Sequence, residues 1–175
     1  MFQTYLRDSH YFFSKGLEDS NEKTAYMRAA IFHLASAVEA FVSKVAYALE
    51  EANTVSKDEL DFLKDRKFRV DADTAVVNEE SNFNAIDKKL RYLVNKYVNS
   101  PESVFRSNEW AEYLDFKRFR NELVHPKNVS EDFEFNKYND AIEKGLRSTI
   151  SLLNQISLSV YGEKFRKSIT DLSPS

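Results

Sequence analysis

The chain has 175 residues, a net charge of −3, no cysteine, and only three glycines and three prolines. Its length fits one domain, and the lack of cysteine excludes disulfides and thiolate metal sites. Glycine and proline form the turns that a many-stranded sheet requires, so their scarcity favours a few long helices. The acidic balance excludes a generally basic nucleic-acid-binding protein, because non-specific binding depends on excess lysine and arginine.

Apolar residues recur at helical spacing in the first fifty residues. They predict a first helix over about 2–16 and a long second helix over 22–51. In the second segment the apolar positions follow every three or four residues from Met27 to Leu49, which indicates one buried face. This helix is expected to form the spine of the core, and its alanines are expected to let another helix approach closely.

The middle of the chain begins with a helix-start signal. Ser56 followed by Glu59 forms a capping box, which predicts a short helix that extends to about Arg69. Residues 70–82 show no sustained period, so a loop is expected there. Apolar residues at helical spacing then predict another helix over 86–97.

Two further helices are predicted in the last part of the chain. Ser107 or Asn108 can cap a helix that runs to Val124. Pro126 ends this helix, because the residue before a proline is steered out of the helical region. After a polar linker, Ser130 can cap a long final helix.

These elements together predict an all-α fold, an up-and-down bundle of about five to six helices in a single domain over 1–175. The tail from about residue 163 is weakly patterned and is expected to fray. No stretch approaches the roughly 20 apolar residues of a membrane span, and the first residues lack the apolar core of a signal peptide. A cytoplasmic protein is therefore expected.

The segment around Arg120, Asn121 and His125 carries the chemistry. Arg120 and His125 are five residues apart, about 140° around a helix, so a helix broken at Pro126 is needed to bring them together. Histidine exchanges protons near neutral pH, and arginine offers a permanent charge and a planar fork for phosphate. With an asparagine to hydrogen-bond a hydroxyl or phosphate oxygen, the trio suits RNA cleavage by its own 2′-hydroxyl without a metal.

Spacing alone is a weak signal in this sequence, because Arg28 and His33 have the same separation. The asparagine after Arg120 and the proline after His125 occur only in the later segment. For Arg28 and His33 a structural role is expected, with His33 partly buried and hydrogen-bonded. The plain alternative for Arg120 and His125 is a helix C-terminus where cations offset the helix dipole.

The six residues from Arg120 to His125 resemble the R-N-x-x-x-H signature of the HEPN superfamily, near the end of its penultimate helix. The second predicted helix, with Glu39 and Phe41 after a run of small residues, is similar to the early helix of several HEPN families. The resemblance implies a helical bundle that forms a homodimer and brings two motifs into one cleft. Catalytic members cut RNA without a metal and leave a 2′,3′-cyclic phosphate, and many serve as toxins or phage-defence effectors.

The resemblance also implies roles for residues. His125 would act as general acid or base, Arg120 would stabilise phosphate charge, and Asn121 would orient either of them. Flanking basic residues would supply a local patch for RNA: Lys117, Arg118 and Lys127. No metal or cofactor is expected, and the implied partners are RNA, a second copy of the chain and an antitoxin or defence-system protein.

A second function stays open at this stage: a non-catalytic helical module that binds RNA, a nucleotide or a protein partner. The acidic composition favours it. A dimer whose two His125 side chains face one cleft would support catalysis, whereas a monomer or a buried motif would support the module.

Glu39, beside the apolar stripe, either points to solvent or reaches the cleft to hold an arginine. The acids at 71–80 do not follow a calcium-loop pattern.

Overall fold

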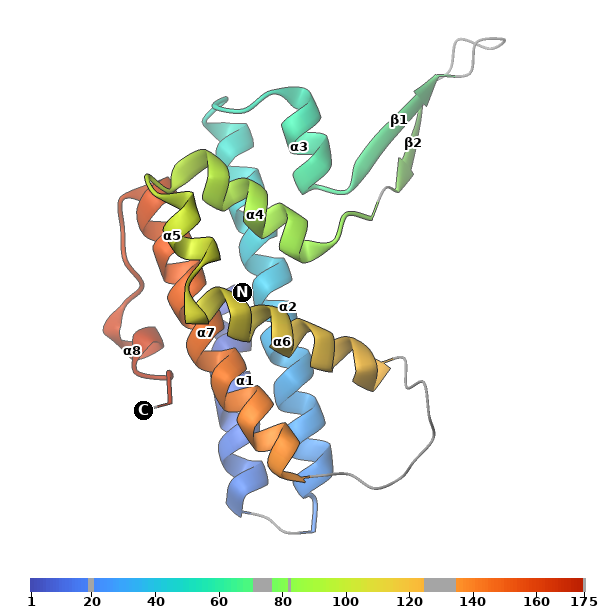
Figure 1. The fold of residues 1–175 in the computed structure, drawn as a ribbon. Helices are drawn as coiled ribbons and strands as arrows, with labels where there is room; N and C mark the ends of the chain where they lie inside the picture. The colour runs from blue at the N-terminus through green and yellow to red at the C-terminus, as the bar shows by residue number, and fades with distance from the viewer. Residues whose placement is uncertain (19–20, 71–76, 82, 125–134, 175) are drawn as a thin grey trace.

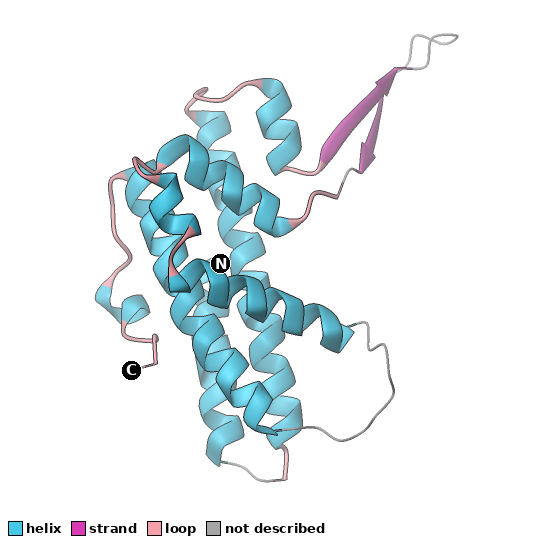
Figure 2. Ribbon diagram, viewed as in Figure 1, coloured by secondary structure: helices cyan, strands magenta, loops and turns pink. Residues whose placement is uncertain are grey.

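The computed structural model describes residues 1–18, 21–70, 77–81, 83–124 and 135–174. Within these ranges the fold is mostly helical, with eight helices and one two-stranded hairpin (Figures 1 and 2). The elements in chain order are α1 Phe2–Glu18, α2 Lys23–Glu51, α3 Lys57–Leu63, β1 Arg66–Val70, β2 Val77–Ser81, α4 Ile86–Tyr97, α5 Pro101–Phe105, α6 Asn108–Val124, α7 Phe135–Tyr161 and α8 Lys167–Thr170.

The long helix α2 forms the spine of the core, as its apolar stripe predicts. It lies against α1 and α7, and α6 packs on α7 (Figure 1). Ala30 and Ala37 have no exposed surface, and the hydroxyl of Ser9 on α1 donates a hydrogen bond to the carbonyl of Ala30 at 2.8 Å. The expected close approach at the small residues of α2 is therefore confirmed.

The predicted capping box is present, but the helix that follows is shorter than predicted. Ser56 and Glu59 exchange both hydrogen bonds of the box, and α3 ends at Leu63 rather than near Arg69. Asp65 takes a left-handed backbone conformation with φ of 58°, which an α-helix cannot contain. Its carboxylate accepts hydrogen bonds from the backbone of Asn84 and from Lys89, and these contacts stabilise the turn.

The expected loop over 70–82 is wrong for its described parts. Residues 66–70 and 77–81 pair as an antiparallel hairpin, with Arg66 opposite Ser81 and Val70 opposite Val77. The hairpin projects away from the helices (Figure 1). A pattern of alternating apolar residues arises only when one face of a strand is buried, so a projecting hairpin held by main-chain hydrogen bonds leaves little signal.

The tail after α7 is also ordered against the core, which corrects the expectation that it frays. The backbone N–H of Phe165 donates to the side chain of Asn154 at 2.7 Å, and the Phe165 ring lies 5.3 Å from that of Phe2. Ile169 in α8 is fully buried. These contacts depend on a few residues that are too widely spaced to form a periodic pattern.

Helix α2 is long enough and, with a mean hydropathy of 1.4, apolar enough to cross a membrane. This differs from the expectation that no stretch of the sequence approaches a membrane span. Half of the qualifying window is buried inside the protein, against α1 and α7. A core helix passes the same test, so this feature does not assign a location.

Gly145 lies where α7 closely approaches its neighbours α6 and α2. A Cβ atom at this position would lie 2.6 Å from the buried ring of Phe116 and 3.2 Å from Leu34. We expect Gly145→Ala to destabilise the protein, because overpacking costs about 1–3 kcal/mol and outweighs a gain in helix propensity of about 1 kcal/mol. Urea unfolding measures the difference. Ser151→Ala on the exposed face of the same helix is the control, and it should change stability by about 0.5 kcal/mol or less.

Glu59 couples α3 to α4 through charge. Its carboxylate accepts hydrogen bonds from Lys96, from the backbone of Ser56 and from the hydroxyl of Tyr92, and these bonds lower its pKa from 4.5 to about 2. Because folding lowers the pKa of this carboxyl, its ionised form stabilises the folded state at pH values above the unfolded-state pKa. This stabilisation is lost as the pH falls from 4.5 toward 2.

We therefore expect Glu59→Gln to be less stable than the wild type at pH 7, with a difference that shrinks below pH 4.5. Urea unfolding measured at a series of pH values tests this. Glu51→Gln, at an exposed position without an ion pair among the described residues, is the control. A difference that stays constant down to pH 3 would contradict the coupling.

Candidate functional site

Helix α6 positions the predicted motif. Ser107 caps it by accepting a hydrogen bond from the backbone N–H of Trp110 at 3.2 Å. Tyr113 and Phe116 are buried on one face. Arg120 lies seven residues after Tyr113 and four after Phe116, so it falls on the same face, and all three residues line one cavity with residues of α2. The periodicity that buries the helix therefore also turns Arg120 inward.

A small cavity of about 50 Å³ lies where this face of α6 meets α2 and α4. Val38 and Glu39 of α2 and Ile86 of α4 form one side of it. The side contributed by α6 includes three polar residues: Lys117, Arg120 and Asn121. Residues from three helices that are distant in sequence thus surround the first two residues of the motif.

Arg120 is half-buried, and only some of its hydrogen-bond donors have partners. One guanidinium nitrogen, Nη1, donates to the side-chain oxygen of Asn121 at 3.3 Å. Its Nε is buried and has no hydrogen-bond partner among the described residues. Buried polar atoms are nearly always hydrogen-bonded, so an unpartnered donor at a cavity is a feature that needs an explanation. The guanidinium retains donors that an incoming oxygen atom can accept from.

The charges around the cavity are balanced. Lys117 forms an ion pair with Asp87 at the start of α4. Glu39 is exposed and also lines the cavity, and no ion pair joins it to Arg120 in the described part of the chain, so it shows features of both sequence alternatives. Tyr113 is buried close by, and burial, Asp87 and Glu39 together raise its pKa.

The other predicted site residues are distributed unevenly. Arg118 points to the surface, where it pairs with Asp115 at 3.1 Å, and it does not line the cavity. His125 and Lys127 lie outside the described residues, as do Pro126 and the proposed cap Ser130. The structure therefore brings Arg120, Asn121 and Lys117 together and separates Arg118 from them.

The second arginine–histidine pair does not converge. Arg28 hydrogen-bonds Tyr138 of α7. His33 lies between the rings of Tyr5 and Phe12, at centroid distances of 5.8 and 5.1 Å. It is partly buried as predicted, but its Nδ1 has no hydrogen-bond partner in the described residues, with Asp8 at 3.7 Å. Identical spacing therefore does not by itself assemble a site.

Asp87 is the site residue that the sequence analysis missed. It stands in the first turn of α4, where an acidic residue is expected simply to offset the helix dipole. Nothing in the sequence connects it with Lys117, thirty residues later. No group of His, Asp or Glu residues in the described ranges is arranged to hold a metal ion.

The chain matches no known protein-family model, and no curated protein or solved structure matches it.

The ion pair between Lys117 and Asp87 is about three-quarters buried at both side chains. A double-mutant cycle with Asp87→Asn and Lys117→Gln should give a coupling energy of about 0.5–1 kcal/mol in unfolding experiments. The same cycle on Asp115 and Arg118, which are both about 70% exposed, should give less than about 0.5 kcal/mol. Equal coupling in the two cycles would show that the first pair does not depend on its partial burial.

Proposed function

We propose that the protein is a metal-independent endoribonuclease of the HEPN type that acts as a homodimer. One observation carries the proposal: Arg120 is held half-buried beside Asn121, with a buried Nε donor that has no partner among the described residues. His125 follows the last residue of α6 directly in the chain. The three residue types that RNA cleavage needs thus lie within six residues of sequence.

The reaction suited to these residues is attack by the 2′-hydroxyl on the neighbouring phosphorus. One base removes the hydroxyl proton, the bond to the 5′-oxygen breaks, and an acid protonates that oxygen. The products are a 2′,3′-cyclic phosphate and a 5′-hydroxyl. His125 suits the proton transfers, and a dimer would supply it twice, once as base and once as acid. Arg120 would donate to the phosphate oxygens, on which negative charge increases in the transition state.

The biological setting that we infer is a cytoplasmic toxin or phage-defence effector. A ribonuclease that cuts cellular RNA must be silenced until it is needed. A companion protein that covers the motif, such as an antitoxin, would do this. This part of the proposal rests on the resemblance of residues 120–125 to the HEPN signature.

A second candidate function is favoured by the ion pairs around the motif. Lys117 is neutralised by Asp87 and Arg118 by Asp115, so two of the three flanking cations that would bind RNA already have carboxylate partners. Such a balanced surface suits a non-catalytic helical module that binds a protein partner. The experiment below separates the two functions.

We expect the wild type to cleave mixed RNA in EDTA, and we expect His125→Ala to lower the rate by at least about 10²-fold, because general acid–base catalysis contributes about that much. Arg120→Ala should also weaken cleavage severely. The measurement is a time course of fragment formation that identifies the ends as cyclic phosphates.

His33→Ala is the matched control, because His33 follows an arginine at the same spacing but contacts Tyr5 and Phe12 instead. Its cleavage rate should equal that of the wild type. Circular dichroism checks that all variants fold. Cleavage that survives His125→Ala would contradict the assignment, and a wild type that binds a protein partner but leaves RNA intact would favour the second function.

A further inference from the structure

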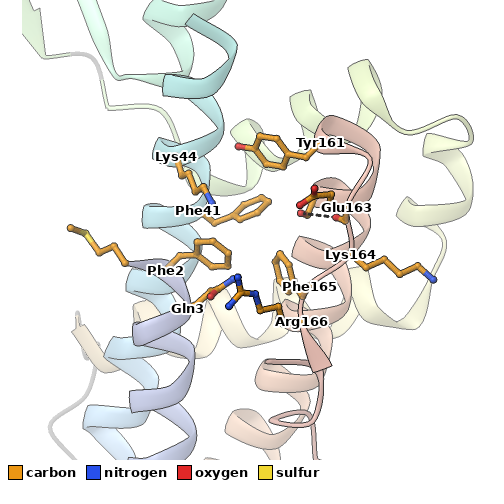
Figure 3. Close-up of a pocket in the computed structure, with 11 residues that line it drawn as sticks. Phe2, Gln3, Phe41, Lys44, Tyr161, Glu163, Lys164, Phe165 and Arg166 are labelled. Carbon is orange, nitrogen blue, oxygen red and sulfur yellow. Dashed lines mark hydrogen bonds between the residues drawn. The ribbon is translucent and has the colours of Figure 1, made fainter. Parts of the chain in front are cut away.

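A second and larger cavity, of about 680 Å³, lies on a different part of the molecule. It is open to solvent and is lined by the start of α1, the second half of α2, the end of α7 and the segment between α7 and α8 (Figure 3). Phe2 and Phe41 form its floor and are almost completely buried. The partly exposed rings of Tyr161 and Phe165 line the cavity from the end of α7 and the segment that follows it, and the Phe165 ring contacts those of Phe2 and Phe41. Its volume is within the range of small-molecule sites in proteins.

The charge of this cavity is positive, in contrast to the whole chain. Lys44 and Arg166 point into it from opposite walls, and Lys164 extends outward at its edge (Figure 3). None of the three has a carboxylate partner in the described residues, although Glu163 also lines the cavity. Elsewhere many cations are paired, including Lys117 and Arg147. Unpaired cations in a concave site attract an anion.

The apolar part of the cavity has its own unsatisfied group. The hydroxyl of Tyr161 is buried and has no hydrogen-bond partner among the described residues. Lys44 lies 5.9 Å from the centre of the Tyr161 ring and 5.5 Å from that of Phe2, so the cation sits over aromatic faces. A ligand there would meet a positive charge and an aromatic surface within one cavity.

We propose that this cavity binds a phosphorylated small molecule of nucleotide size. Its phosphate groups bind Lys44 and Arg166, because an ammonium and a planar guanidinium donate charge-assisted hydrogen bonds. Its organic part packs on Tyr161 and Phe165. Free inorganic phosphate would satisfy only the cations, so the ligand is an organic phosphate that uses both halves of the cavity.

The test is isothermal titration of the purified full chain with four probes: ATP, UTP, tripolyphosphate and adenosine. We expect at least one nucleotide to bind more tightly than tripolyphosphate and adenosine. The double variant Lys44→Gln/Arg166→Gln should weaken this binding by about tenfold or more, because it removes both positive charges and the charged hydrogen bonds that they donate. Binding should also weaken as the salt concentration rises.

Arg7→Gln/Lys88→Gln is the matched control, since it removes two exposed cations that do not line the cavity. It should leave the affinity unchanged. Arg120→Ala should also leave it unchanged, which separates this site from the proposed RNA-cleaving site. The proposal is overturned if none of the phosphates binds at millimolar concentration, if tripolyphosphate binds as tightly as both nucleotides, or if the control double variant weakens binding as much as Lys44→Gln/Arg166→Gln.

Discussion

Burial of the apolar stripe of α2 is the interaction on which the other features depend. Small residues on this helix allow close neighbours, and the hydrogen bond from Ser9 to Ala30 shows how near α1 comes. Because α2 is fixed by its buried face, its other positions are fixed as well. Glu39 faces the cavity beside Arg120, and Lys44, little more than one turn later, faces the larger cavity. One helix therefore positions a residue in both proposed sites.

The sequence predicts the long helices well, because their stripes are buried on one side and extend over many turns. The bounds of α2, Lys23–Glu51, differ by one residue from the expected start at 22. Local signals predict less where a single residue decides the outcome. The left-handed conformation of Asp65 prevents α3 from continuing. Contacts of Asp65 with Asn84 and Lys89, about twenty residues later in the chain, stabilise this conformation. No local pattern contains that information.

The candidate site was predicted only in part, for a related reason. The neighbourhood of Arg120 and Asn121 follows from their adjacency in sequence, and the inward direction of Arg120 follows from helical periodicity. The neutralisation of Lys117 cannot be predicted from the local sequence, because its partner Asp87 belongs to another helix. A run of basic residues does not ensure a positively charged surface, because the tertiary structure can pair their side chains with carboxylates. The larger cavity shows the reverse case, in which scattered cations come together without partners.

The contact between Phe2 and Phe165 joins residues near the two ends of the described chain. During synthesis on the ribosome, α1 and α2 emerge early, and the rings of Phe2 and Phe41 come together as soon as these helices associate. They stay uncovered on one side until the segment with Phe165 and Ile169 emerges. A chain that stops after α7 would therefore leave the rings of Phe2 and Phe41 without the cover that Phe165 provides.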